Sequence, residues 1–520
     1  MKAFLATLAC AGLIVATRLP WFGDHIYNLD TAVRGTLGWG WSEGLAPLRD
    51  LYGSTKPPGL DLLYMGLFKV FGFSLVSLQW LALGLALATA LAVGLLAKAL
   101  FDGRAGFYAA FAYAGASCFV YGPMDWLEPH TEYLATLLVL LAALCLAPLA
   151  RGGSCLWAFP SGLLLAEAAF TRQNVLLFAF PLALGFGLMA WRQRPRAVPF
   201  ALFWGLAGLA GGIAPWAWYY RQLGALDNLL LFSWTLPGAY ATGHSPLDAL
   251  LGMPFALGAW ATSCAPVAGL GLWYLLQKEE GSRLRGAKLL VLFMLLGGIA
   301  AASFGGRPFG HYLLMMAPFA ALAAAGAVAV LAPVVYSSKV KSAPASPVAG
   351  VLALLFFVWL IAGALSTVQP PLRAIATNDP GSLTAYYAGE KDWLPAVKTL
   401  VQKNTPPGSR IAVFGHPSVY IASDRLPAAR DFWGNFLTGY WGHASDPKAF
   451  AFARGDWAQD IASGKAALVV DLGGEGHERL TDYPEIAKAL KTNYKLSIPL
   501  SAKAPNVLIW APKKPVKPAQ

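Results

Sequence analysis

Long apolar stretches with few charged residues fill the chain up to about residue 367, and beyond it apolar and polar residues mix in ordinary proportions. A membrane-spanning helix needs about 20 predominantly apolar residues. A first apolar run extends from Ala3 to Thr17, behind Lys2. Further spans are predicted at residues 75–98, 105–121, 132–150, 156–171, 174–191, 198–219, 249–276, 289–303, 313–334 and 347–367. The pattern therefore predicts a polytopic α-helical membrane protein with about eleven transmembrane helices.

The first apolar run also has the length of a signal-peptide core. No small-x-small cleavage site lies at the usual distance before the bulky sequence Arg18-Leu19-Pro20-Trp21, so an uncleaved anchor is favoured. Residues 18–74 then form a long first loop on the periplasmic side. Within it, the run 60–72 is too short to span a membrane and carries Asp61 and Lys69. We expect this run to be an amphipathic helix at the membrane interface.

The chain beyond residue 370 combines helical and strand patterns. A helix-like run ends in the turn-forming sequence Thr405-Pro406-Pro407-Gly408. Buried-strand patterns follow at residues 410–415, 466–471 and 507–510. The sequence therefore predicts three parts. They are a transmembrane domain at 1–369, a small soluble α/β domain at 370–512, and a disordered Lys/Pro-rich tail at 513–520.

Composition supports the membrane assignment. Of the 520 residues, 57% are hydrophobic and 13% are charged, whereas a soluble domain carries about 25% charged residues. The net charge of +12 does not indicate a nucleic-acid partner, because the basic residues form neither a basic arm nor an aromatic-interleaved patch. The five cysteines lie in or beside apolar runs without CxxC spacing, so no disulfide framework or thiolate metal site is expected.

The orientation follows from the basic residues in alternate loops. With the amino terminus in the cytoplasm, the cytoplasmic side receives the larger set: Lys98, Arg104, Arg151, Arg192, Arg194, Arg196, Lys278, Arg283, Arg285, Lys288, Lys339 and Lys341. The short loops of the opposite side carry only Arg172, Arg221 and Arg307. An odd number of spans then places the carboxy-terminal domain in the periplasm. We expect a multi-pass protein of the inner (plasma) membrane.

The first loop holds candidate site residues on the outer face. It contains Asp24, Asp30 and the sequence Ser54-Thr55-Lys56-Pro57-Pro58-Gly59. Paired prolines fix the backbone and force the preceding Lys56 into an extended conformation. A fixed cation beside a membrane interface suits a lipid-linked phosphate. Asp24 and Asp30 could instead be solvated loop acids, the reading favoured for Asp24, and Lys56 could extend to lipid headgroups.

Three later loops carry further charged residues, which are predicted to lie on the same outer face of the membrane. Glu132 opens a span, where an ionisable group is costly without a partner or a function. Arg172 follows the span 156–171, and Arg307 and His311 lie in the loop before residue 313. Structural alternatives remain: Glu132 could cap its helix, Arg172 could mark a helix end, and Arg307 and His311 could hydrogen-bond within their loop.

These motifs resemble the family 39 type of bacterial membrane glycosyltransferases. That group has the GT-C fold and includes protein O-mannosyltransferases, the lipid A aminoarabinose transferase and lipopolysaccharide galacturonosyltransferases. The resemblance covers residues 1–335, and residues 408–420 are similar to the external domain of many members. It rests on Asp30, on residues 44–50 running into 56–59, on Thr131-Glu132, on Phe170-Thr171-Arg172-Gln173, and on Gly306-Arg307 followed by His311-Tyr312.

The resemblance implies an inverting transfer of a sugar from a polyprenyl-phosphate donor to a lipid, glycan or protein acceptor at the extracytoplasmic face. Asp30 would be the general base, which takes the proton of the acceptor hydroxyl. The family has a Glu after this acid and this chain has Thr31, so Asp24 remains a rival base.

Glu132 would be the second acid. Lys56, Arg172, Arg307 and His311 would face the donor phosphate and stabilise the charge that develops on it. No metal site is assigned, although a divalent cation could bridge the phosphate and the three acids Asp24, Asp30 and Glu132 if they converge.

Two other functions compete with this one. A transporter or flippase for a polyprenyl-linked glycan is typically marked by internal repeats and by ionisable groups near the bilayer midplane. Neither an obvious repeat nor a mid-span charge pair is found in the sequence. A non-catalytic membrane anchor whose external domain binds a partner is the third possibility, and the ordered acids of the first loop argue against it.

Overall fold

The computed structural model describes residues 2–119, 122–237, 254, 257–277, 282–303, 310–336, 347–386, 392–437, 448–473, 478–497 and 507–514. The chain divides into two compact units. The first, here called the helical unit, comprises Met1–Gly23, Leu78–Trp218 and Pro246–Tyr386. The second, called the mixed unit, comprises Asp24–Ser77, Tyr219–Ser245 and Tyr387–Gln520.

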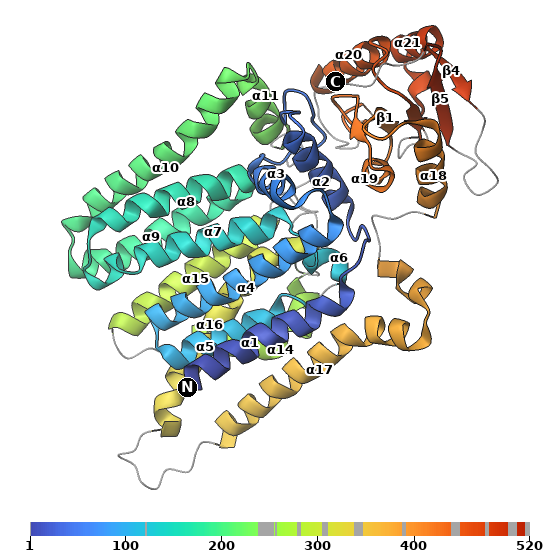
Figure 1. Ribbon diagram of the computed structural model, residues 1–520. Coiled ribbons are helices and arrows are strands. Elements are labelled where there is room, and N and C mark those ends of the chain that lie inside the picture. The colour runs from blue at the N-terminus through green and yellow to red at the C-terminus, as the bar shows by residue number, and fades with distance from the viewer. Residues whose placement is uncertain are drawn as a thin grey trace. The chain divides into compact units, whose positions relative to one another are not determined.

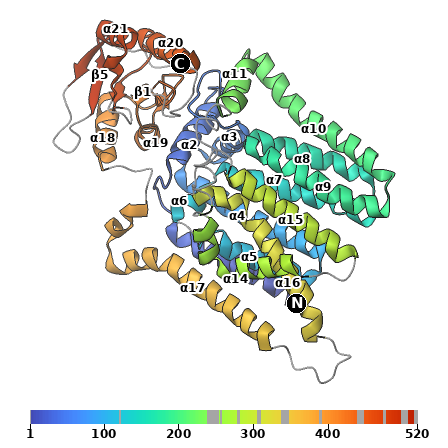
Figure 2. The ribbon, with the colours of Figure 1, turned by 180° about the vertical axis from the view of Figure 1, so that it is seen from behind.

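Apolar helices make up the helical unit, and α7, α8, α9 and α10 run side by side in both views of the ribbon (Figures 1 and 2). The helices are α1 (Lys2–Arg18), α4 (Leu75–Leu100), α5 (Gly103–Ala116), α6 (Pro123–Trp126), α7 (Thr131–Leu146), α8 (Ala158–Thr171), α9 (Leu176–Gln193), α10 (Ala197–Gln222), α14 (Ala265–Leu276), α15 (Ser282–Ser303), α16 (Ala317–Tyr336) and α17 (Pro347–Thr377). Short 3-10 turns connect them: η1 (Leu19–Trp21), η2 (Leu149–Arg151), η3 (Cys155–Trp157), η4 (Gln173–Val175), η6 (Gly310–Met315) and η7 (Pro380–Tyr386).

Several of these helices meet the length and hydropathy of a membrane span. Within the described ranges there are five: Leu75–Leu100, Gln173–Trp191, Ala197–Gln222, Arg285–Ser303 and Val351–Thr377. A sixth results if Leu257–Ser263 and Ala265–Leu276, bent by 105°, form one span. Shorter apolar helices lie at Leu5–Trp21, Thr131–Leu146, Cys155–Thr171 and Ala317–Leu331. The chain is thus a polytopic membrane protein, and the number of about eleven spans stays a prediction.

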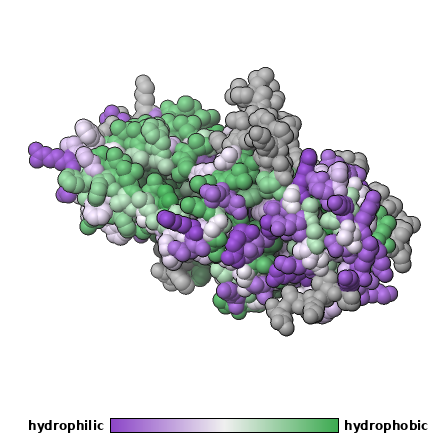
Figure 3. Space-filling model, turned by 90° about the horizontal axis from the view of Figure 1, so that it is seen from above, coloured by the Kyte–Doolittle hydropathy of each residue, from purple (hydrophilic) through white to green (hydrophobic). Residues whose placement is uncertain are grey.

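The surface of the helical unit is apolar, as a surface in contact with lipid requires. Figure 3 shows hydrophobic side chains gathered over the helical part of the molecule and more hydrophilic ones over the carboxy-terminal part. Phe180, Phe200, Leu354 and Leu365 are among the large hydrophobic side chains that are more than half exposed. Such a surface would be an aggregation hazard in water, but it is the stable arrangement in a bilayer.

The mixed unit joins part of the first loop to the carboxy-terminal region. Its helices are α2 (Leu29–Ser42), α3 (Gly59–Phe71), α11 (Leu226–Leu230), α18 (Leu394–Asn404), α19 (Ser418–Ser423), α20 (Lys448–Ala462) and α21 (Pro484–Asn493), with shorter turns η5 (Leu231–Thr235) and η8 (Leu480–Asp482). The strands described are β1 (Arg410–Phe414), β2 (Leu426–Pro427), β3 (Val469–Asp471), β4 (Tyr494–Ser497) and β5 (Leu508–Pro512).

One sheet contains these five strands, in the order β2-β1-β3-β5-β4. Strand β1 pairs in parallel with β2 and β3, and β5 pairs antiparallel with β3 and β4. Strand β1 is buried over Ile411–Phe414 because its residues are almost all apolar, which is typical of a parallel strand covered on both faces. The strand patterns read at 410–415, 466–471 and 507–510 coincide with β1, β3 and β5.

Hydrogen bonds tie the first loop to the carboxy-terminal region inside the mixed unit. The Tyr52 amide donates to the carbonyl of Arg430 (2.7 Å), and the Trp433 indole donates to the carbonyl of Gly53 (2.9 Å). The Tyr52 hydroxyl also donates to the Asp456 carboxylate (2.5 Å). Residues near position 53 are therefore ordered by segments roughly 380 positions further along the chain.

Some boundaries differ from the sequence pattern. The helix predicted at 60–72 coincides with α3, whereas α17 continues past the end of the predicted span, through Pro370 and Pro371 to Thr377. Residues up to Tyr386 cluster with the helical unit. Of the predicted disordered tail 513–520, residues 515–520 lie outside the described residues.

Candidate functional site

Glu132 lies in the first turn of α7, inside the helical unit, with a fully buried side chain (0% exposed). Its carboxylate forms an ion pair with Arg172 and accepts a hydrogen bond from the Thr131 hydroxyl (2.9 Å). A buried carboxylate is stable only when it is paired and hydrogen-bonded, and both conditions hold here. The fold thus brings Glu132 and Arg172, which are 40 residues apart in the sequence, into contact.

Arg172 follows the last residue of α8 and precedes η4, where the helix ends and its side chain turns inward. Besides the ion pair with Glu132, its guanidinium donates to the Thr131 hydroxyl (3.1 Å). It also lies over the Tyr312 ring, with 4.3 Å from the guanidinium carbon to the ring centroid. A cation over an aromatic face gains electrostatic energy. Three side chains therefore fix the position of this guanidinium.

His311 comes from η6 and lies between two carboxylates. Its Nδ1 is 3.3 Å from Asp125 Oδ1, and its backbone amide donates to the same oxygen (3.0 Å). Its Nε2 is 3.8 Å from Glu132 Oε1. The ring stacks on His130, with centroids 4.5 Å apart and planes 7° from parallel. Asp125 thus fixes the ring, and the other ring nitrogen faces Glu132.

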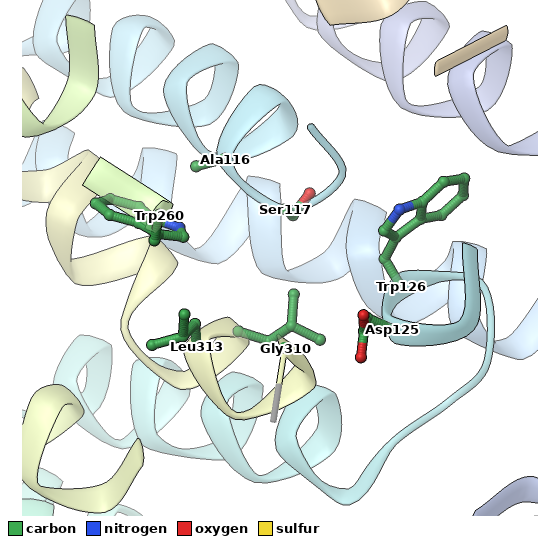
Figure 4. A pocket seen from close by; sticks show the side chains of 8 residues that line it. Ala116, Ser117, Asp125, Trp126, Trp260, Gly310 and Leu313 are labelled. Carbon is green, nitrogen blue, oxygen red and sulfur yellow. The ribbon is translucent and has the colours of Figure 1, made fainter. Parts of the chain in front are cut away.

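The cluster of Glu132, Arg172, His311, Asp125 and His130 collects acids and bases from four chain segments. Figure 4 shows Asp125 beside Trp126, across from Gly310, at a small cavity. This cavity has a volume of about 10 Å³, room for about one water molecule. The cluster lies at one end of the apolar helices α7 and α8.

Asp30 and Lys56 meet in the mixed unit. Asp30 is in the first turn of α2, whose N-cap residue Asn28 accepts a hydrogen bond from the Asp30 amide (2.9 Å). The Lys56 ammonium forms an ion pair with the Asp30 carboxylate, with the lysine 15% and the aspartate 37% exposed. The Asp30 carboxylate is thus partly exposed and held in one direction by a cation.

A second ion pair, between the buried side chains of Arg34 and Asp61, supports the loop that carries Lys56. Arg34 Nη1 is 2.7 Å from Asp61 Oδ2, and both side chains are at most 3% exposed. The same guanidinium donates to the Ser54 hydroxyl (3.0 Å) and the Pro57 carbonyl (3.3 Å). Burial raises the pKa of the Asp61 carboxyl to about 6, and Arg34 opposes this effect. Through its hydrogen bonds to Ser54 and to the Pro57 carbonyl, Arg34 holds the loop that carries Lys56.

The remaining candidates are placed differently. Asp24 is exposed at the start of the mixed unit, and Arg307 lies outside the described residues. Asp24 and Asp30 belong to the mixed unit, and Glu132 belongs to the helical unit. Sequence reasoning did not assign Asp125 or His130, although both lie in the polar stretch before Glu132.

Comparison with known proteins identifies the fold. No protein-family model matches the chain, and no curated protein matches it in sequence. Solved structures do match. The archaeal oligosaccharyltransferase AglB from Archaeoglobus fulgidus, in complex with an inhibitory peptide and a dolichol-phosphate, is 12% identical, with a TM-score of 0.54 over 99% of this chain and 74% of that one.

ArnT from Cupriavidus metallidurans is similar over almost its whole length. Bound to undecaprenyl phosphate, it is 14% identical, with a TM-score of 0.55 over 98% of this chain and 97% of that one. In the apo state it has the same identity and coverage and a TM-score of 0.57. The fold expected from the sequence, the GT-C fold, is confirmed.

Proposed function

We propose that this protein is a glycosyltransferase that moves a sugar from a polyprenyl-phosphate donor to a lipid, glycan or protein acceptor at the extracytoplasmic face of the inner membrane. The observation that carries the proposal is the buried Glu132–Arg172 pair with His311 at one end of the apolar helices. It occurs in a fold shared with ArnT, solved with undecaprenyl phosphate, and with AglB, solved with dolichol-phosphate.

The cationic groups would stabilise the leaving phosphate. When the bond between the anomeric carbon and the phosphate oxygen breaks, negative charge develops on that oxygen. A guanidinium carries five N–H donors in a planar fork that suits phosphate, and Arg172 is already fixed by Glu132, Thr131 and Tyr312. In this proposal Glu132, the second acid, sets the positions of Arg172 and His311, and Arg307 adds a further cation.

Asp30 would act as the general base. It would take the proton from the acceptor hydroxyl while the acceptor oxygen bonds to the anomeric carbon, and the phosphate would leave with the electron pair of the broken bond. One displacement of this kind inverts the anomeric configuration. The ion pair with Lys56 supports Asp30 over Asp24, because it holds the carboxylate in one direction. Lys56 has three N–H donors, so it can contact a donor phosphate as well.

The test is transfer of radiolabelled sugar from a panel of polyprenyl-phosphate sugars, in membranes that overexpress the protein. The wild type should label a membrane product, and Asp30→Asn should abolish labelling while the protein accumulates normally. Asp102→Asn is the matched control, because Asp102 is an exposed N-cap of α5 and asparagine caps a helix equally well.

Each other outcome has a defined meaning. If labelling survives in Asp30→Asn and disappears in Asp24→Asn, Asp24 is the base. If no donor gives labelling above the level of membranes without the protein, and the protein moves a polyprenyl-linked glycan across proteoliposomes, the transport hypothesis replaces the transferase.

A further inference from the structure

A large apolar cavity lies among helices α8, α9 and α10 of the helical unit, and its lining on α9 runs from Leu176, four residues after Arg172, to Trp191. Its volume is about 540 Å³, within the range of roughly 300 to 1,000 Å³ that ligand pockets occupy. Among the described side chains that line it, Ser161 is the only one with a hydroxyl group. The cavity therefore suits a hydrocarbon and offers almost nothing to a polar ligand.

Glycine residues build this space. A Cβ atom at Gly162 of α8 would collide with the carbonyl oxygen of Gly205 of α10, so these two helices touch at a point where both lack side chains. On α9, a Cβ atom at Gly187 would meet nothing within 4 Å, although Gly187 lines the cavity. The missing side chain of Gly187 thus opens part of the cavity, whereas the other two glycines allow close packing beside it.

The cavity is long and narrow. Its lining on α9 runs from Leu176 to Trp191, which is about 22 Å along a helix. This length matches a single extended acyl chain.

The Trp191 end of the cavity is next to exposed cations. Trp191 and Val198 line the cavity, and Arg194 and Arg196, both exposed, lie in the turn between them. On α8 the lining is confined to Ala158–Leu165. Arg172 lies just before α9 begins, whereas Arg194 and Arg196 follow its end, so these two cations are at the other end of α9 from the Glu132–Arg172 cluster. Basic residues at a membrane surface attract anionic headgroups.

We propose that this cavity binds one acyl chain of an anionic phospholipid, whose headgroup lies against Arg194 and Arg196. The length of the cavity fits one extended chain, its apolar lining favours a hydrocarbon, and the two arginines favour an anionic headgroup. This lipid is distinct from the polyprenyl donor, and the inference does not depend on the proposed transferase activity.

Native mass spectrometry of the purified full-length protein tests the inference. The probes are phosphatidylglycerol and phosphatidylcholine with identical acyl chains, and undecaprenyl phosphate. The wild type should retain one phosphatidylglycerol in preference to phosphatidylcholine. Gly187→Leu fills the cavity and should lower the affinity for phosphatidylglycerol roughly tenfold, because the displaced carbons lose their packing contacts. Ala183→Leu, also in the lining, is a second filling variant.

Gly84→Leu is the matched control, because a Cβ atom at Gly84 of α4 also meets nothing within 4 Å and this residue does not line the cavity. The double variant Arg194→Gln/Arg196→Gln should abolish the preference for phosphatidylglycerol over phosphatidylcholine. Equal retention of phosphatidylglycerol by Gly187→Leu, Ala183→Leu and the control would overturn the inference. So would a wild type without headgroup preference, or filling variants that lose undecaprenyl phosphate and keep phosphatidylglycerol.

Discussion

Replacing Asp61 by alanine removes one half of the buried ion pair with Arg34 in the mixed unit. The charged atoms are 2.7 Å apart and both side chains are almost fully buried. Loss of one partner leaves the other charge buried without compensation, which costs about 3–5 kcal/mol. We expect Asp61→Ala to lower the free energy of unfolding by about this amount, so that the melting temperature falls clearly.

The double variant Arg34→Met/Asp61→Leu replaces the pair by apolar side chains of similar size. Such replacements are often neutral or stabilising, so its melting temperature should return close to that of the wild type. Its activity should not return, because Arg34 also donates to Ser54 and to the Pro57 carbonyl and so holds Lys56. Loss of two hydrogen bonds of about 1 kcal/mol each should raise the donor KM by roughly tenfold or more.

Two measurements separate the effects. Thermal unfolding in detergent, followed by tryptophan fluorescence, reports stability, and labelled-sugar transfer at several donor concentrations gives KM and kcat. An unchanged melting temperature in Asp61→Ala would refute the energetic reasoning. A double variant that recovers both the melting temperature and the wild-type KM would refute the positioning role of Arg34.

Three further predictions concern other residues. Glu132→Gln leaves Arg172 without its buried carboxylate, so we expect sugar transfer to fall by about a hundredfold; transfer near the wild-type rate would contradict the assigned role. Tyr312→Leu removes the cation–π contact with Arg172, worth about 0.5–2 kcal/mol, and should raise the donor KM with little change in the melting temperature. Burial raises the pKa of the Asp431 carboxyl to about 8. The native state then binds more protons than the unfolded chain between pH 4 and 8, so this group makes the protein less stable as pH rises through that window. Asp431→Asn should flatten the fall of the melting temperature between pH 5 and 9, and an equally steep fall in the variant would show that another group is responsible.

The sequence predicted the features that depend on local pattern. Apolar runs indicated the membrane helices, an amphipathic run indicated α3, and apolar residues after a Pro-Gly turn indicated β1. Glu132 and Arg172 were predicted at the same level of the membrane, because both lie at span ends on the same face, but their ion pair was not predicted.

Features that depend on tertiary packing were not predictable in this way. Arg34 and Asp61 are 27 residues apart and pair only because α2 and α3 pack together. Asp125 contacts His311 through a four-residue helix that has too few turns for a periodic pattern. Strand β2, with two residues, is likewise too short to give an alternating pattern.

The hydrogen bonds of Tyr52 and Gly53 have a consequence for biosynthesis. Their partners at Arg430 and Trp433 are made long after the first loop, since Gly53 and Trp433 are 380 positions apart. At about 5–20 residues per second, the ribosome needs roughly 20 to 75 seconds to reach them. During this interval the first loop lacks its contacts with Arg430 and Trp433. The packing around Tyr52 and Gly53 is therefore completed late, when translation is nearly finished.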